Sequence, residues 1–168
     1  MLCVIAKLSG EATEKLRAVR EAVLPPEAKN RPLYGHITLA TYLPEDCEAF
    51  IRDCGEMVRG CPSFCVRYEK IAVLSETSII AALPRKGGFL AYLHGRIAEK
   101  YGGDLDRWTR DDGWIPHTTL LHDPEADLDA LCRVMGERFE PFEAKVERIE
   151  LSSVEEDGYR ILQSFDLL

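Results

Sequence analysis

The feature that most constrains the fold of this 168-residue chain is an internal repeat. A helical stripe of apolar residues returns 81 positions later, first as Cys47, Phe50, Ile51, Cys54 and Val58 and then as Leu128, Leu131, Cys132, Met135 and Phe139. A short strand pattern follows each helix and repeats at an offset of 78, as Phe64, Glu69, Lys70 and Ile71 and then as Phe142, Glu147, Arg148 and Ile149. A length change of three residues reconciles the two offsets. The chain is therefore expected to contain two copies of one unit.

Hydrophobic periodicity predicts alternating strands and helices. Strands are expected at residues 2–8, 36–43, 64–74, 78–83, 115–122, 142–152 and 159–167, and helices at 11–24, 47–58, 88–101 and 126–139. Half-buried strands with intervening helices favour an antiparallel or mixed sheet with helices on its outer face. The predicted fold class is α+β, with two ferredoxin-like lobes in one bilobal domain of residues 1–168. The lobes span approximately 1–76 and 77–168, strand exchange between them is allowed, and a central cleft is the expected ligand site.

Bulk properties exclude several classes of function. The net charge of −8 opposes extended contact with duplex DNA, although a nucleotide or an RNA end remains allowed. No apolar run approaches the length of a membrane span, and we expect a cytoplasmic protein. The six cysteines form no CxxC pair and are expected to be reduced. Cys61 and Cys65 lack a second ligand pair, so no metal site is predicted.

Two H-x-T-L motifs occupy equivalent positions in the two halves, again 81 residues apart. They are His36-Ile37-Thr38-Leu39 and His117-Thr118-Thr119-Leu120. Side chains alternate along a strand, so each histidine is expected to share a face with the threonine two residues on. The cleft would then hold two imidazoles and two hydroxyls.

This set of groups suits chemistry on a phosphate ester without a metal or other cofactor. Histidine exists in both protonation states near neutral pH, so one ring can accept a proton from the nucleophile while the other protonates the leaving oxygen. The hydroxyls of Thr38 and Thr119 can donate hydrogen bonds to the non-bridging phosphate oxygens. We predict His36 and His117 as catalytic residues and Thr38 and Thr119 as substrate-binding residues.

The two motifs resemble the hallmark of the 2H phosphoesterase superfamily, which includes the LigT-like 2'-5' RNA ligases and cyclic phosphodiesterases. The resemblance covers nearly the whole chain. It implies a metal-independent hydrolase acting on a 2',3'-cyclic phosphate or a 2'-5' linkage of a nucleotide or RNA end. It also implies acid and base roles for His36 and His117, and phosphate contacts for Thr38 and Thr119.

One position departs from the family pattern. Several LigT-like members have an arginine five residues after the second motif histidine, where this chain has His122. Simple strand alternation places His122 on the face opposite His117. The same alternation, together with the lack of a carboxylate cluster, disfavours a metallohydrolase built from His117, His122 and Asp123.

Further candidates lie around the motifs. Basic residues that precede them are Lys29, Arg31, Arg107 and Arg110, although acidic neighbours make a solvated loop an equal alternative. Candidates to stack on a base are Tyr34, Trp108 and Trp114, and Arg85-Lys86 before Gly87-Gly88 is a candidate anion site. His94 is interpreted as a structural residue on a helix.

The main alternative function is a non-catalytic module of the same fold that binds a nucleotide or an RNA end. The sequence leaves open which histidine is the acid, whether hydrolysis or ligation is favoured, the physiological substrate and the oligomeric state.

Overall fold

The computed structural model describes residues 1–25, 32–110, 112–155 and 158–168. Its strands are β1 (Leu2–Leu8), β2 (His36–Tyr42), β3 (Phe64–Val73), β4 (Ile79–Pro84), β5 (Thr118–His122), β6 (Phe142–Glu155) and β7 (Gly158–Asp166). The helices are α1 (Gly10–Glu21), α2 (Glu48–Val58), α3 (Gly88–Tyr101) and α4 (Leu128–Arg138), with a 3-10 turn, η2, at Gly102–Asp104. The α+β class and the element order match the prediction.

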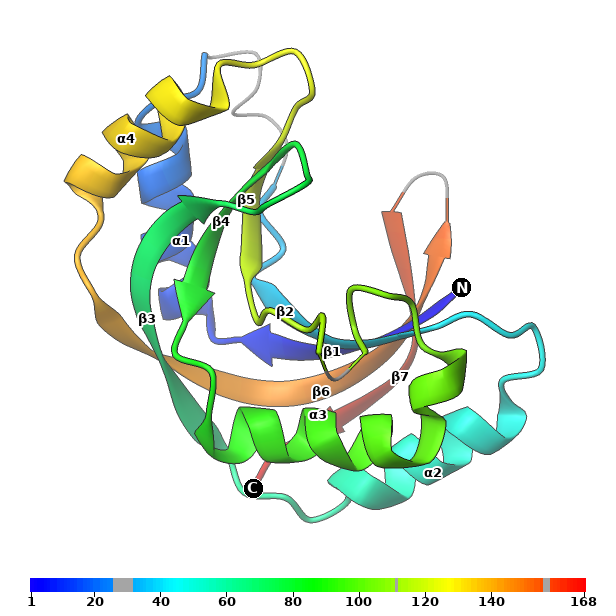
Figure 1. Cartoon of the computed structure of the whole chain (residues 1–168). Helices are drawn as coiled ribbons and strands as arrows, with labels where there is room; N and C mark the ends of the chain where they lie inside the picture. The colour runs from blue at the N-terminus through cyan, green and yellow to red at the C-terminus, as the bar shows by residue number, and fades with distance from the viewer. Residues whose placement is uncertain (26–31, 111, 156–157) are drawn as a thin grey trace.

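All strand pairings are antiparallel and belong to one seven-stranded sheet, in the order β2-β1-β6-β3-β4-β5 with β7 also beside β6. The long strand β6 joins the two parts of the sheet. Its first residues pair with β3, its later residues pair with β7, and β1 lies along its other edge. The sheet curves into a C, so the end strands β2 and β5 approach each other across the opening (Figure 1).

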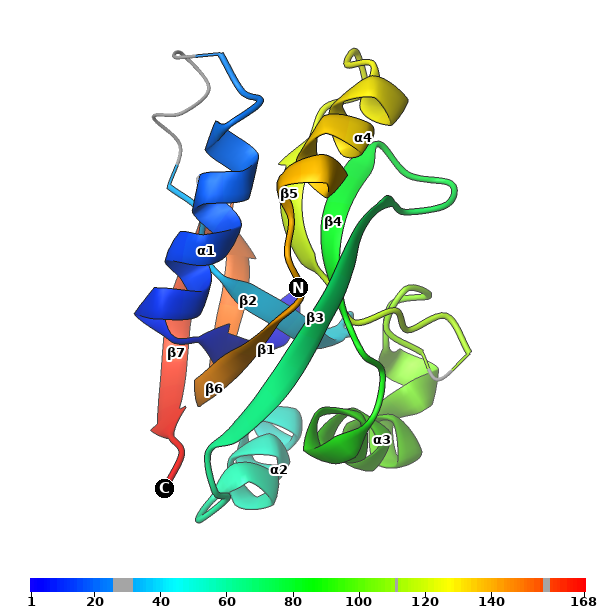
Figure 2. The ribbon, with the colours of Figure 1, turned by 90° about the vertical axis from the view of Figure 1, so that its left-hand side faces the viewer.

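The helices cover the outer face of the curved sheet in two pairs. Helix α1 contacts α4 at one end of the C, and α2 contacts α3 at the other (Figures 1 and 2). Each pair therefore combines one helix from each half of the sequence. The division into lobes near residue 76 stays a prediction about the repeat.

Local sequence explains the ends of several elements. Ser9 and Asp127 cap α1 and α4, each accepting a hydrogen bond from a backbone N–H three residues on. Strand β5 begins at Thr118, three residues later than predicted, because Pro116 has no backbone N–H to donate to a ladder. His117 consequently lies just before the strand.

The core fills the space between the sheet and the helices. Val4 and Ala6 of β1 are completely buried there, and so are Leu16 of α1 and Phe50 of α2. All six cysteines are free thiols, and Cys65 is the one that is exposed. Among the described residues, no helix is long and apolar enough to cross a lipid bilayer.

A β-bulge interrupts both motif strands at the same repeat position. In β2 the pairing with β1 passes from Thr38 to Ala40 and skips Leu39, and in β5 the pairing with β4 passes from Thr119 to Leu121 and skips Leu120. Leu39 and Leu120 are 81 residues apart. The repeat thus extends to the irregularities of the backbone.

Candidate active site at the meeting of the two motif strands

The two motif histidines are held by the same local geometry. His36 Nδ1 lies 2.6 Å from the carbonyl oxygen of Tyr34, and His117 Nδ1 lies 2.8 Å from that of Ile115. A carbonyl can only accept, so each Nδ1 carries the hydrogen and each neutral ring has its lone pair on Nε2. Both rings thus present the nitrogen that can exchange a proton with a ligand.

Burial lowers the pKa of both imidazoles from the ordinary 6.5. The backbone hydrogen bond to Tyr34 or Ile115 opposes this shift, because it stabilises the charged ring. The pKa of His36 is lowered further by the charge of His117 and that of Lys7. The two histidines are therefore within electrostatic reach of each other, and both favour the neutral form near pH 7 in the free protein.

Residues of both motifs line one cavity of about 450 Å³. Thr38 and Thr41 come from the first half of the chain, and His117 comes from the second. The ring of Tyr159, which also lines the cavity, meets the His36 ring edge-on with centroids 5.4 Å apart. The fold thus places Thr38 and His117 around one space, with His36 beside its Tyr159 wall.

Thr119 is the remaining predicted site residue. The pairing of β5 with β4 shows on which face of the sheet its side chain lies. It pairs with Ala81 of β4, which lies on the same face of that strand as the cavity residue Ile79. The side chain of Thr119 is half-buried, like that of Thr38. Thr119 therefore belongs to the cavity face.

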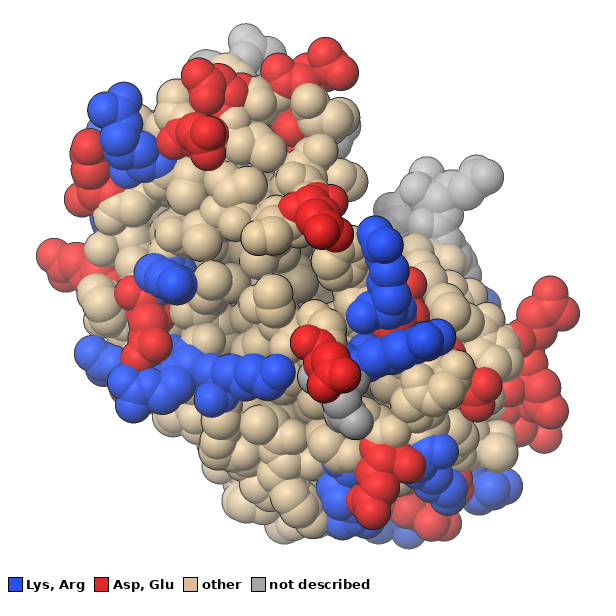
Figure 3. All heavy atoms as spheres, in the orientation of Figure 1, with Lys and Arg blue, Asp and Glu red and all other residues tan. Residues whose placement is uncertain are grey.

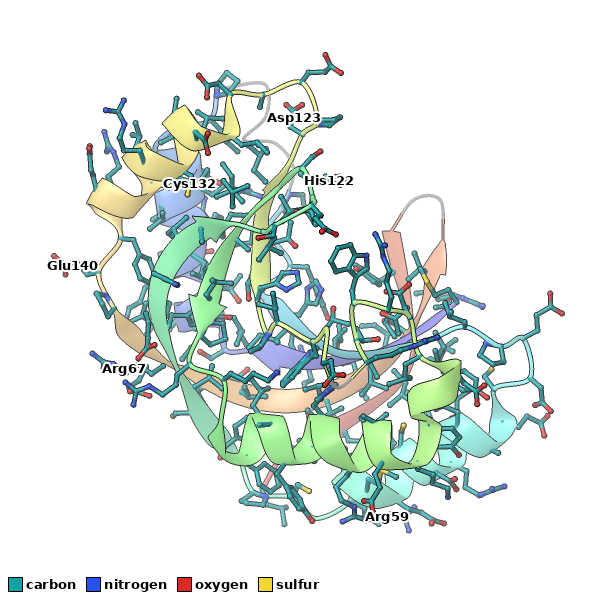
Figure 4. All side chains as sticks on the ribbon, viewed as in Figure 1. Arg59, Arg67, His122, Asp123, Cys132 and Glu140 are labelled. Carbon is teal, nitrogen blue, oxygen red and sulfur yellow. The ribbon has the colours of Figure 1, made fainter. Side chains whose placement is uncertain are left out.

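The expected orientation of His122 was wrong. His122 pairs with Ile79, and Ile79 lies on the cavity face, so His122 points to that face as well. The bulge at Leu120 adds one residue and reverses the alternation that places His122 opposite His117. His122 and Asp123 lie at the far end of β5, where His122 is exposed (Figure 4).

The bulge at Leu39 reverses the alternation of β2 in the same way. It brings Thr41 into the cavity, a residue that simple alternation missed.

Aromatic side chains form much of the cavity wall. Trp108 and Tyr159 line the cavity and are 40% and 46% exposed, although Arg107 covers one face of the Trp108 ring. Trp114 is buried and stacks on His94 with ring centroids 3.8 Å apart. Tyr159 escaped sequence analysis because it comes from the start of β7, far along the chain from either motif.

Second-half side chains satisfy the outer edge of β2. The indole N–H of Trp114 donates to the carbonyl oxygen of Thr38 over 2.9 Å, and His94 Nδ1 donates to that of Leu39 over 2.9 Å. The backbone N–H of Thr41 donates to Thr109 Oγ1 over 3.0 Å. These bonds hold the first motif against the segment that leads into the second.

A charged network lies behind His36. The buried carboxylate of Glu150 pairs with Arg148 over 2.9 Å and accepts a hydrogen bond from the hydroxyl of Tyr34 over 2.5 Å. Lys7 lies over the Tyr34 ring, 4.4 Å from its centroid, and donates to the carbonyl oxygen of Gly35. The negative charge of Glu150 raises the pKa of His36 against the stronger effect of burial. The pKa shift of His117 has burial and the Ile115 carbonyl as its causes.

The basic residues singled out in the sequence have different partners in the structure. Arg110 donates to the carbonyl oxygen of Leu105, and Arg107 lies over the Trp108 ring. Lys86 donates to the carbonyl oxygen of Trp114, while Arg85 pairs with Glu69. Lys29 and Arg31 lie outside the described residues. On the face shown in Figure 3, charged side chains gather around the rim of the central hollow, whose surface is largely uncharged.

Within the described part of the chain, no three histidine, cysteine or carboxylate side chains come together in a group able to hold a metal ion. The groups gathered at the cavity are instead imidazoles, hydroxyls and aromatic rings. They can donate and accept protons and hydrogen bonds at a phosphate.

Solved structures with the same fold cover almost the whole chain. E. coli LigT in complex with 3'-AMP aligns with a TM-score of 0.67 at 20% identity, covering 99% of this chain and 97% of LigT. A protein of Thermus thermophilus aligns with a TM-score of 0.64 at 18% identity, with coverage of 99% and 97%. A protein described as a phosphoesterase aligns with a TM-score of 0.66 at 20% identity, again with coverage of 99% and 97%.

No curated protein matches the chain by sequence. The sequence profile of the 2'-5' RNA ligase superfamily, however, matches residues 8–158, which include both motifs and most of every element except β1 and β7. The chain therefore belongs to the 2'-5' RNA ligase superfamily, with the LigT-like fold of the 2H phosphoesterases.

Proposed function

We propose that this protein is a metal-independent phosphoesterase for nucleotides or RNA ends, acting on a 2',3'-cyclic phosphate or a 2'-5' linkage. His36 and His117 are its general acid and base, and Thr38 and Thr119 bind the phosphate. The observation that carries the proposal is the matched pair of imidazoles. Each is tied through Nδ1 to a carbonyl two residues earlier; His117 lines the cavity where β2 meets β5, and the ring of His36 contacts Tyr159 of the same cavity wall.

For a cyclic phosphate the reaction balances with these groups alone. One imidazole takes a proton from water as the water oxygen bonds to phosphorus. The other gives a proton to the ribose oxygen as its bond to phosphorus breaks. The rings end with their protonation states exchanged, and solvent restores them. Hydrogen bonds from the two threonine hydroxyls to the non-bridging oxygens would stabilise the charge that develops there.

Two further observations support a nucleotide substrate. The exposed rings of Trp108 and Tyr159 give the cavity stacking surfaces suited to a base. E. coli LigT, which shares the fold, has been solved with 3'-AMP, phosphate, ATP and NADP+. A 3'-nucleotide is the product expected when the 2'-oxygen leaves a 2',3'-cyclic phosphate.

The test is turnover of a substrate panel with EDTA present throughout. The panel contains 2',3'-cyclic mononucleotides, 2'-5' dinucleotides and RNA that ends in a cyclic phosphate. We expect at least one class to be hydrolysed, and we expect His36→Ala and His117→Ala each to lower kcat by about 10² to 10⁴. Thermal unfolding and binding of 3'-AMP establish that the variants are folded.

The rival function is a module that only binds nucleotides or RNA ends. Absence of turnover on every panel member, with 3'-AMP bound equally by the wild type and both variants, would replace the proposal with this alternative. Turnover that appears only when a divalent metal is added in excess of the EDTA would also overturn it.

A further inference from the structure

Thr118, the variable residue of the second motif, faces away from the cavity and is buried, with 1% of its surface exposed. Its hydroxyl donates to the carbonyl oxygen of His36 over 2.8 Å. It also lies 2.5 Å from the hydroxyl of Tyr68, a completely buried side chain of β3. Thr118 has one hydroxyl hydrogen, and the His36 carbonyl takes it, so Tyr68 must be the donor of the second bond. The result is an ordered chain of hydrogen bonds from Tyr68 to Thr118 to His36.

These hydrogen bonds connect the two candidate catalytic residues by a short path. Thr118 directly follows His117 in the backbone, and its side chain holds the peptide group of His36. His36 is also fixed on its other sides, by pairing with Lys7 of β1 and by the bond from its ring to Tyr34. The position of each histidine therefore depends on the other through one side chain.

The arrangement is not a relic of the duplication. Ile37 occupies the corresponding place in the first motif, and an isoleucine side chain cannot donate a hydrogen bond. The bond between the two motifs therefore runs from Thr118 of the second half to His36 of the first, and Tyr68 of β3 supports it. The bond satisfies the partly buried carbonyl of His36 on the outer edge of β2.

We propose that Thr118, supported by Tyr68, is a positioning residue that sets the separation and orientation of His36 relative to His117. This inference rests on the proposed function, because its consequence is catalytic. A displacement of about 1 Å between reacting groups lowers a rate by about 10². Loss of the Thr118 hydroxyl is therefore expected to act on kcat more than on KM, since neither Thr118 nor Tyr68 reaches the cavity.

The experiment compares wild type, Thr118→Val, Tyr68→Phe and the double variant on the best substrate of the panel. Valine keeps the size and branching of threonine and removes only the hydroxyl. We expect Thr118→Val to lower kcat by about 10- to 100-fold with KM changed by no more than about threefold. The double variant is expected to resemble Thr118→Val, because Tyr68 acts through Thr118.

Two further variants separate positioning from general damage. Thr118→Ser restores the donor and is expected to recover most of kcat. Tyr101→Phe removes the hydroxyl of another tyrosine, a partly buried one, which donates to Asp53 between α2 and α3. It is expected to keep the wild-type kcat.

An NMR titration of the imidazoles provides a readout independent of turnover. Burial is the main cause of the low pKa of His36, so a loosened ring in Thr118→Val should gain water and titrate at higher pH. His117 should titrate as in the wild type.

The outcomes distinguish this inference from the proposed function. A wild type without turnover on any substrate contradicts the proposed function itself. An active wild type whose Thr118→Val variant keeps kcat within about twofold, with an unchanged His36 titration, refutes the positioning role alone. A fall in kcat that Thr118→Ser does not recover also counts against it.

Discussion

Trp114 donates its indole N–H to the carbonyl oxygen of Thr38 over 2.9 Å. A residue three places before His117 thus holds a residue two places after His36. Trp114 is itself supported by its stack on the buried ring of His94. The two motifs, distant in the sequence, are therefore fastened together beside the cavity that they line.

Replacing Trp114 with phenylalanine tests this fastening. The variant keeps an aromatic ring for the stack on His94 but leaves the Thr38 carbonyl without its donor. We expect the free energy of unfolding to fall by about 1–3 kcal/mol, as measured by urea denaturation. Trp108→Phe is the matched control, because Trp108 is 40% exposed, and it should change stability by less than about 0.5 kcal/mol. Equal effects of the two substitutions would show that the bond to Thr38 contributes nothing.

The repeat made most of the fold predictable from sequence. Its apolar stripes located the helices and its β-forming runs located the strands, because burial of one face dictates both periods. The two bulges were not predictable, since Leu39 and Leu120 look like ordinary strand residues. That omission misplaced His122 and missed Thr41. A similar limit applied to Tyr159, Glu150 and Tyr68, which reach the site from β7, β6 and β3 only through long-range strand pairing.

We expect the charge of Glu150 to act on the pKa of His36. Its negative charge favours the protonated form of His36, so Glu150→Gln is expected to lower the pKa of His36 further, as followed by NMR titration. Glu143→Gln provides the control, because it removes a carboxylate from an exposed ion pair with Arg67. A titration of His36 that does not move, or that moves equally in both variants, would contradict a specific effect of Glu150.

The exposed ring of Trp108 should contribute to binding rather than to chemistry. Stacking of a base on an aromatic ring contributes about 1–3 kcal/mol, so Trp108→Ala is expected to raise KM for cyclic nucleotides about 5- to 150-fold with kcat largely kept. The matched substrate is ribose 2',3'-cyclic phosphate, which has no base and should show no change in KM. An equal loss on both substrates would argue against stacking at this position.

The pH dependence follows from the pKa values of the two histidines. The base must be neutral and the acid must be protonated, so activity rises through the first pKa and falls through the second. Burial holds both values below 6.5 in the free protein, and the optimum of kcat/KM should therefore lie on the acid side of 6.5. A bound phosphate favours protonated rings, so the profile of kcat should be displaced to higher pH. Coincident profiles with an optimum above about pH 7 would disagree with this prediction.

Acid should also destabilise the folded protein through these same groups. A histidine whose pKa is lower in the folded state than in the unfolded state loses its stabilising contribution as pH falls from 6.5 through the folded pKa. Replacing His36 and His117 together with asparagine should therefore flatten the fall in melting temperature over that range. A slope identical to that of the wild type would mean that neither ring is held neutral by the fold.

The most direct test of the central claim is the pH profile of kcat/KM for the wild type, His36→Asn and His117→Asn on one cyclic nucleotide, measured in EDTA. If the two histidines are the acid and the base, the wild type gives a bell-shaped pH profile of kcat/KM. Each variant then keeps a low activity that has lost one limb, with the acid limb absent in one variant and the alkaline limb in the other, which assigns the two roles. If both variants keep both limbs, other groups carry the protons and the account of His36 and His117 as a catalytic pair is wrong.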